Sequence, residues 1–249
     1  MPSVDNNTIR TAIVNLTIMG KRVKVEIPVP EGFVRPTALL PIFYNLADIA
    51  ADIAVDAAQK QGRNLSCKKG CGACCRQLVP ISEAEKHRLR DVVSSMPEPV
   101  QTKIRNRFTA IERRLESEKM LESLLDITNL DVETRHSLGR DYFRLGMPCP
   151  FLEDESCSIH SERPASCREY VVSSPAENCA QPTAENIEKI SVPAAASGAA
   201  YGIGLKIGEK PRILPLSLAM FKAEADTEML PINTADTLEK AFRSLGASR

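Results

Sequence analysis

The sequence predicts a mainly α-helical chain with small β-hairpins. Two observations predict this fold class. Apolar residues recur at spacings of three and four over much of the 249 residues, which is the period of an amphipathic helix. Alternation of apolar and polar residues, the period of a half-buried strand, is confined to short stretches. Strands and helices do not alternate regularly, so a parallel α/β sheet is not expected.

The first 62 residues predict a β-hairpin followed by a long helix. Residues 11–18 and 22–28 have strand character, because apolar and charged side chains alternate in VKVEI, and Met19-Gly20-Lys21 supplies the turn. From about 37 to 60 the apolar residues fall on one helical stripe. That stripe consists of Leu39, Phe43, Leu46, Ala50, Ile53 and Ala57.

Residues 63–182 predict helices on either side of turn-rich, cysteine-bearing segments. Ser82 and Glu85 have the spacing of a capping box, and a second helix begins near Pro97. A third helix covers about 131–145. The segments CPFL and CSIH can pair as a hairpin around 153–156, after which Pro164 suits the first turn of a helix that carries Cys167. The expected buried side of the helix after Pro97 is Val100, Ile104, Phe108, Ile111 and Leu115.

Residues 183–249 predict a C-terminal helical extension. Helices are expected over 194–205, over 214–225 and over 234–246, the last capped by Asn233 or Thr234 and ended by Gly246. The chain then divides into three segments. They are 1–62 with the hairpin and long helix packed on the core, 63–182 with the cysteines, and 183–249 with the extension. We expect them to form one compact unit.

Composition excludes several classes of function. Lys plus Arg and Asp plus Glu are equal in number, aromatic residues make up 4 %, and Trp is absent. A nucleic-acid partner is therefore not expected. The N-terminus lacks a secretory signal. The most apolar stretch, 38–58, is interrupted by Asn45 and three aspartates, so a membrane partner is not expected either. We expect a cytoplasmic protein, in which thiols stay reduced.

All eight cysteines fall in two clusters. The first is Cys67-x3-Cys71-x2-Cys74-Cys75, and the second comprises Cys149, Cys157, Cys167 and Cys179. Short spacings let one loop wrap a metal ion, and Gly70 and Gly72 free its backbone to turn. Zinc takes four such ligands, and iron–sulfur clusters also use four Cys thiolates. Two groups of four allow two independent sites, or one shared site with spare thiols. About seventy residues of expected helix separate the clusters and can return the chain to its start.

The adjacent pair Cys74 and Cys75 bears on how many metal atoms are bound. In an extended segment neighbouring side chains point to opposite sides, so the two are expected to serve different metals, or one is held in reserve. Either Cys74 or Cys75 would join Cys67 and Cys71 in facing the second cluster. Basic residues beside the clusters can offset the negative charge of the thiolates. They are Lys68, Lys69, Arg76, Arg163 and Arg168. His160 is expected not to be a ligand, and Cys179 is the weakest of the candidate ligands.

Four separate motifs occur in order along residues 67–170. They are CxxxCGACCR from Cys67, CPFL from Cys149, CSI from Cys157, and RPxxCRxY from Arg163 to Tyr170. This arrangement resembles the CxxCxxCC cysteine-cluster family, whose members are described as zinc- or iron-chelating proteins. His160 stands where the family usually has an aromatic residue. The resemblance implies that the cysteines bind zinc or iron, and that Arg76, Arg163, Arg168 and Tyr170 surround them.

Three functions follow as hypotheses. The first is a metal-binding protein whose helical domain is organised around a cysteine-ligated centre of zinc or iron–sulfur. The second is an S-adenosylmethionine-dependent enzyme. Cys67, Cys71 and Cys74 have the spacing of the radical type, and flagellin lysine-N-methylases carry a related cluster, but no glycine-rich loop following a strand is found here. The third is a zinc-stapled module that presents a surface to a protein partner.

Overall fold

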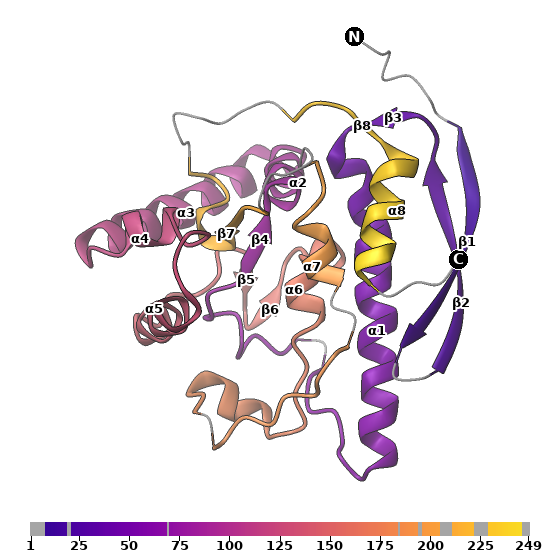
Figure 1. Cartoon of the computed structure of the whole chain (residues 1–249). Helices are drawn as coiled ribbons and strands as arrows, with labels where there is room; N and C mark the ends of the chain where they lie inside the picture. The colour runs from indigo at the N-terminus through magenta and orange to yellow at the C-terminus, as the bar shows by residue number, and fades with distance from the viewer. Residues whose placement is uncertain are drawn as a thin grey trace.

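The computed structural model describes residues 8–18, 21–68, 70–183, 185–193, 196–204, 211–221 and 229–245. It is mainly helical, with strands in antiparallel pairs, as the sequence predicts. The long helix α1 (Leu40–Lys60) separates the N-terminal hairpin from the helices that carry and flank the cysteines (Figure 1).

The N-terminal hairpin is confirmed and is slightly longer than predicted. Strand β1 (Ile9–Ile18) pairs antiparallel with β2 (Lys21–Pro30), and Ile18 lies opposite Lys21. The predicted turn at Met19-Gly20 lies outside the described residues. One face of the hairpin, including Ile18 and Ile27, is buried against α1 and its neighbours. The alternation in VKVEI is therefore the burial pattern of a sheet with one packed face.

Helix α1 is confirmed, with a first turn of 3-10 geometry, η1 (Pro36–Leu39). Leu39, Phe43, Leu46 and Ala50 are buried, which confirms that the apolar stripe faces the core. By length and composition Pro36–Lys60 could also cross a membrane, but 56 % of its most apolar window is buried inside the protein, as in the core helix of a globular domain. No other helix in the described part of the chain passes that test.

Four helices follow the first cysteine cluster. They are α2 (Glu83–Ser94), α3 (Glu98–Ser117), α4 (Leu121–Leu125) and α5 (Val132–Arg144). The capping box is confirmed, since Ser82 Oγ accepts from the Glu85 N–H at 3.1 Å and the Glu85 carboxylate accepts from the Ser82 N–H at 2.8 Å. The predicted burial of Val100 is wrong, because Val100 lies in the first turn of α3 and is 41 % exposed.

The predicted hairpin around 153–156 is confirmed. Strand β5 (Leu152–Glu153) pairs with β6 (Ser156–Cys157), and Asp154 and Glu155 adopt positive φ in the turn. A 3-10 turn η2 (His160–Glu162) leads to α6 (Ala165–Arg168), which carries Cys167. A second 3-10 segment, η3 (Ala176–Ala180), carries Cys179.

The C-terminal extension is less helical than predicted. Helix α7 (Ala196–Ala200) is a single short helix, and Ile213–Pro215 forms strand β7 against β4 (Pro80–Ser82) rather than starting a helix. The 3-10 turn η4 (Leu216–Leu218) follows, and residues 222–228 lie outside the description. Helix α8 (Thr234–Ser244) is confirmed, with Asn233 as its cap; Gly246 lies outside the described residues. Strand β8 (Ile232–Asn233) pairs with β3 (Phe33–Val34).

Three buried clusters position the site. One combines the hairpin, α1, α7 and α8 with Ala84 of α2 and Ala165 of α6, so it draws on residues from all three segments of the chain. A second joins α2 and α3 to Phe151, Ile159 and Leu216, and Cys149, Cys157 and Cys167 pack against it. A third joins α3, α4 and α5. The second cysteine cluster is therefore anchored directly on the helical core.

Candidate metal centre

Six of the cysteines line one cavity of about 150 Å³. Three come from the 67–75 loop and three from the second cluster. They are Cys71, Cys74, Cys75, Cys149, Cys157 and Cys167. Each is partly exposed, and none forms a disulfide. The structure thus brings both clusters to a common cavity, which favours one shared site over two independent ones.

The backbone joins the two clusters directly. The N–H of Cys149 donates to the carbonyl oxygen of Cys75 at 2.7 Å. Helices α2 to α5 lie between these two residues in sequence and return the chain to the first cluster (Figure 1). A second tie lies at the start of the loop, where the N–H of Ser66 donates to Val172 at 3.0 Å and its hydroxyl donates to Ser173 at 3.0 Å.

Cys74 and Cys75 lie in a turn, not in an extended segment. The N–H of Cys75 donates to Gly72 at 2.9 Å, and the N–H of Gln77 donates to Cys74 at 3.1 Å. Both thiols line the cavity, and they are hydrogen bonded to each other. The premise that the doublet points to opposite sides is therefore wrong, because consecutive turns coil the backbone around the cavity.

Gly72 allows the two cysteine segments to approach each other. A Cβ on this residue would lie 2.6 Å from Leu152 Cδ1 and 2.7 Å from the Glu155 carbonyl oxygen. Both atoms belong to the β5–β6 hairpin. Only glycine fits a contact this close without moving one of the loops. The sequence suggested that Gly72 frees the backbone to turn, whereas the structure shows that it makes room for a neighbour.

Arg76 fastens the same two loops from the outside. Its guanidinium donates to both carboxylate oxygens of Glu155, at 3.0 and 2.6 Å, and to the Gly72 carbonyl at 3.1 Å. A bidentate pair of this kind fixes orientation as well as distance. Arg76 also holds the pKa of the exposed Glu155 below its usual value.

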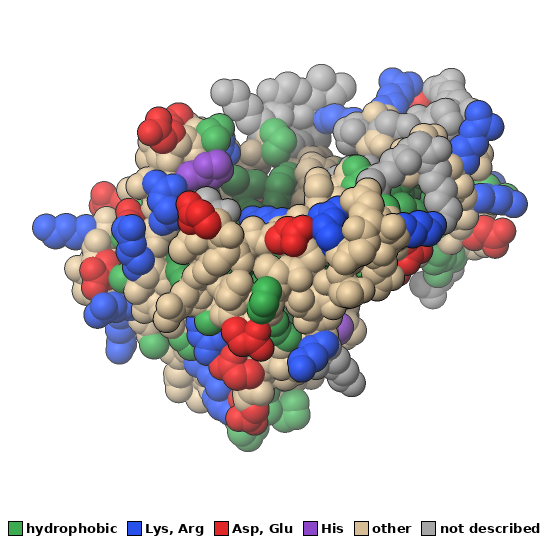
Figure 2. Space-filling model, turned by 90° about the horizontal axis from the view of Figure 1, so that it is seen from below, with side chains coloured by type: hydrophobic (Ala, Val, Ile, Leu, Met, Phe, Trp, Pro, Cys, Tyr) green, Lys and Arg blue, Asp and Glu red, His purple; other side chains and the backbone are tan. Residues whose placement is uncertain are grey.

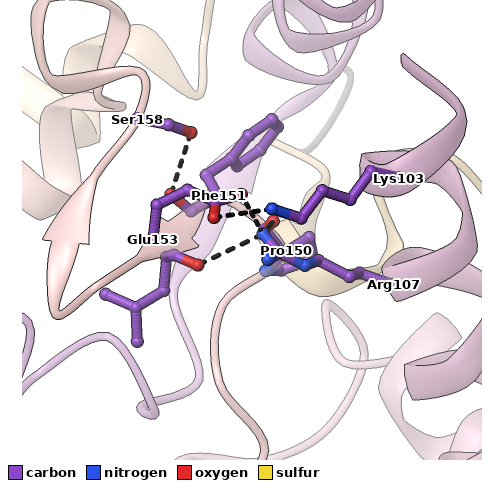
Figure 3. Close-up of polar contacts among 7 residues, drawn as sticks. Lys103, Arg107, Pro150, Phe151, Glu153 and Ser158 are labelled. Atoms are coloured by element: carbon purple, nitrogen blue, oxygen red, sulfur yellow. Dashed lines mark hydrogen bonds and ion pairs between the residues drawn. The ribbon is translucent and has the colours of Figure 1, made fainter. Parts of the chain in front are cut away.

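Helix α3 holds the far side of the β5–β6 hairpin. Arg107 donates to the carbonyls of Pro150 and Leu152 at 3.0 and 3.2 Å and pairs with Glu153 at 2.6 Å. Lys103, one turn earlier, donates to the other Glu153 oxygen at 3.0 Å. Figure 3 shows both basic side chains reaching from the helix toward this loop. Cys149 and Cys157 flank the residues that are held in this way.

Cys167 is positioned by a buried carboxylate. The backbone N–H of Cys167 donates to the Pro164 carbonyl oxygen at 3.0 Å in the first turn of α6. The first residue of that helix, Ala165, donates its N–H to Glu85 Oε1 at 2.9 Å, while Glu85 Oε2 accepts from Ser82. Glu85 is fully buried, so this one carboxylate caps both α2 and the helix that carries Cys167.

Burial and thiol–thiol contact disfavour the thiolate form of these cysteines while no cation is bound. The hydrogen bond that the Cys74 thiol makes with Cys75, followed by burial, raises the pKa of Cys74 far above its usual range. Burial raises the pKa of Cys149 to about 12 and raises that of Cys167 well above normal. Arg163, which lines the cavity, opposes these shifts at Cys74 and Cys167.

Two cysteines lie beside the cavity without lining it. Cys67 precedes the turns, and Cys179 is buried in η3. Burial raises the pKa of Cys179 to about 11, and the charges of Cys74, Cys67 and Cys71 add to that shift.

The other predicted residues divide between the cavity and the core. Lys68, His160 and Tyr170 line the cavity, and Tyr170 OH accepts from Gln77 Nε2 at 3.0 Å. Arg168 does not line it. Its guanidinium pairs with Asp48 on α1 at 2.5 Å and stacks over the Tyr44 ring, so it fastens α6 to the long helix. Lys69 lies outside the described residues.

The donor set of the cavity fits a thiolate-ligated centre of zinc or iron. As the side chains stand, no three His, Cys, Asp or Glu residues of the described chain surround a single ion. Room for one water is about 10–15 Å³, so the cavity of about 150 Å³ is much wider than one ion requires. Thiolates are the ligands preferred by zinc and by iron–sulfur clusters.

A family model with the description "CxxCxxCC: Putative zinc- or iron-chelating domain" matches residues 66–190, half of the chain. The chain belongs to this family. The CxxCxxCC region contains all eight cysteines and every residue that lines the cavity except Leu216, and the family's description supports metal binding by the chain. No curated protein and no solved structure matches the chain significantly.

Sequence reasoning missed several residues that shape the CxxCxxCC site. Glu155, Arg107 and Lys103 hold the loops, and Gln77 joins the first loop to Tyr170. The only local signal for Arg107 is its place next to the apolar stripe of α3, one residue before Phe108. Glu85 was identified as a capping residue, but its bond to Ala165 joins distant parts of the chain and has no local pattern.

Proposed function

We propose that this protein holds a polynuclear metal centre, of zinc or of iron with sulfide, in the cavity between the 67–75 loop and the second cysteine cluster. The observation that carries the proposal is the number of thiols. Six cysteines line one cavity, whereas a mononuclear structural zinc site takes four ligands. A family description of zinc or iron chelation agrees with the elements named.

Two compositions are compatible with six thiols. Two zinc ions can share six thiolates, as in the Zn2Cys6 class of sites. An iron–sulfur cluster takes four thiolates and leaves two thiols beside it. Bound zinc would supply structural stability or Lewis acidity, and an iron–sulfur cluster would supply electron transfer.

The residues of the chain prepare the cavity for either composition. Arg163 and Lys68 line it and place positive charge beside a thiolate cluster that is strongly negative. The Arg76–Glu155 pair joins the 67–75 loop to the β5–β6 hairpin, and Arg107 holds the same hairpin to α3, so the two walls of the cavity are kept apart at a fixed distance. Phe151 and Ile159, buried beside the cysteines, limit access of water from the core side.

A radical S-adenosylmethionine enzyme is less well supported. That class is expected to place its three cysteines after the first strand of a partial βα barrel. The strands in the described residues form four two-stranded antiparallel sheets, and the cysteine loop follows helix α1. The described residues therefore contain no βα-barrel sheet that would support this alternative.

The proposal is tested by purifying the full chain without oxygen and measuring metal, sulfide and absorbance. We expect either a colourless protein with about two zinc ions per chain, or a brown protein with iron and sulfide absorbing near about 400 nm. Cys157→Ala should lose much of the metal. Cys179→Ala is the matched control, because Cys179 is buried outside the cavity and should leave metal content unchanged. A single zinc ion or no metal in the wild-type chain would contradict the proposal.

A further inference from the structure

A second hollow lies next to the cysteine cavity. It is a cleft of about 840 Å³ between helix α5 and the segment 180–189. Basic side chains line it, and no Asp or Glu does. The basic residues are Arg135, His136, Arg140, Arg144 and Lys189. Because the whole chain has equal numbers of acidic and basic residues, this cleft concentrates positive charge.

Helix α5 presents most of that charge. His136, Arg140 and Arg144 are spaced by four residues and therefore share one face of the helix. Arg144 pairs with Asp141 at 2.7 Å. Within the described residues, Arg135 and Arg140 make no ion pair. Figure 2, seen from below, shows Lys and Arg side chains interspersed with Asp and Glu on the left of the molecule, on the side where Figure 1 places α3 to α5.

The opposite wall of the cleft carries polar and basic groups that are held by contacts within the protein. Asn186 braces it, because its Oδ1 accepts from the Thr183 N–H at 2.7 Å and its Nδ2 donates to Gln181 at 2.9 Å. Gln181 and Thr183 line the cleft. Lys189 lies with its ammonium 4.8 Å from the centre of the Tyr170 ring, so its position is also held. Charges on held residues bind an anion with less loss of side-chain entropy.

The cleft and the cysteine cavity share a wall. Gln77 and Leu78 line both hollows. Gln77 donates to Tyr170 OH, and Tyr170 lies between the cysteines and Lys189. An anion in the cleft would thus lie on the other side of Gln77 and Leu78 from the proposed metal centre.

We propose that this cleft binds a small organic polyphosphate, of the nucleoside di- or triphosphate type, beside the metal centre. Guanidinium groups match phosphate oxygens in bidentate fashion, and three arginines suit a ligand with several negative charges. The volume lies within the range of about 300–1,000 Å³ of small-molecule sites. Phe143 supplies an apolar surface for the organic part of the ligand. The cleft does not depend on the composition of the centre, so this proposal goes beyond metal binding.

The test is calorimetric titration of the metal-loaded full chain with inorganic pyrophosphate and with adenosine triphosphate. We expect saturable binding of both that weakens as salt is raised. The double substitution Arg135→Gln/Arg140→Gln should weaken binding by about tenfold or more, since it removes charged hydrogen-bond donors. The control Arg105→Gln/Arg113→Gln removes the same charge from exposed positions on α3 outside the cleft, and should change affinity less than about twofold.

Two results would overturn the proposal. One is equal weakening in the control variant, which would make the effect one of net charge. The other is that neither small probe shows saturable binding, and tight binding of a single-stranded oligonucleotide or an acidic peptide would then identify a different occupant. The cleft would then be a docking surface for a macromolecule.

Discussion

The backbone N–H of Cys149 donates a hydrogen bond of 2.7 Å to the carbonyl oxygen of Cys75. This contact joins the last residue of the first cysteine cluster to the first residue of the second. Four helices lie between them in sequence, so the contact forms only when the helical core has folded. The proposed metal centre would thereby be coupled to the helical core.

Removing metal should open the hydrogen bond between Cys149 and Cys75 before the rest of the fold is affected. Structural zinc contributes on the order of 10–16 kcal/mol of apparent binding free energy, which is comparable to the whole stability of a domain. After chelation under reducing conditions, we expect the Cys149 amide to exchange its hydrogen much faster. Amides that pair β1 with β2 lie far from the cavity lining and should change less. Hydrogen exchange followed by mass spectrometry measures both, and unchanged protection near Cys149 would count against coupling.

Substituting Gly72 by alanine should push the two cysteine loops apart. The new Cβ would lie within 3 Å of Leu152 and of the Glu155 backbone, and a backbone contact cannot rotate away. We expect a loss of about 1–3 kcal/mol in unfolding free energy, with reduced metal content. Gly139→Ala is the control, because no atom lies within 4 Å of that Cβ, in the interior of α5. It should stabilise by up to about 1 kcal/mol. Equal effects of the two substitutions would refute the close-approach argument.

Substituting Glu85 by glutamine should destabilise the fold and disturb Cys167. A glutamine has one acceptor oxygen, so either Ser82 or Ala165 would face its NH2 group with an unsatisfied buried N–H. The expected loss is about 1–3 kcal/mol, measured by urea unfolding of the metal-loaded chain. Glu116→Gln, at an exposed position of α3 that makes no ion pair in the described part of the chain, should cost less than about 0.5 kcal/mol. If Glu85→Gln costs no more than this control, Glu85 does not hold the two helices together.

Stability should depend on pH through the Arg76–Glu155 pair. The hydrogen bond from Arg76 is the main reason that the pKa of Glu155 is lowered in the folded state. The ion pair therefore stabilises the fold at pH values above the usual glutamate pKa of 4.5, and this stabilisation is lost as pH falls through the lowered pKa. The difference in melting temperature between the wild type and Glu155→Gln should therefore be present at pH 7 and shrink below about pH 4.5.

The control for that measurement is Glu122→Gln on α4. Glu122 is exposed and makes no ion pair in the described part of the chain. Its difference from the wild type should stay small and constant over the same range of pH. A gap for Glu155→Gln that widens as pH falls would contradict the assignment of this ion pair.

Local patterns were sufficient for much of the fold. The hairpin, α1, the capping box at Ser82 and the cap at Asn233 were predicted because each rests on residues adjacent in sequence. Strand β7 was not, since three residues cannot show a period and its partner β4 is more than a hundred residues away. Without that pairing, the apolar run around Leu216 is as compatible with a helix as with a strand.

The candidate site could be predicted in membership but not in geometry. Spacing predicts that the cysteines are ligands, and the structure brings six of them to one cavity. The orientation of Cys74 and Cys75 was missed because neighbouring side chains point to opposite sides only in an extended segment, whereas the N–H of Cys75 bonds to Gly72 and the N–H of Gln77 bonds to Cys74 in successive turns. Likewise, Arg168 resembles a cation beside the thiols in sequence, but its nearest acidic partner is Asp48 on α1.

The most direct test of the central claim is X-ray absorption spectroscopy at the edge of the bound metal in the anaerobically purified chain. Sulfur neighbours at about 2.3 Å are expected for zinc in any thiolate site. The deciding feature is the next shell. We predict scattering from a second metal atom, because six thiols surround one cavity. A shell of four sulfurs with no metal neighbour would show a mononuclear site and contradict the account.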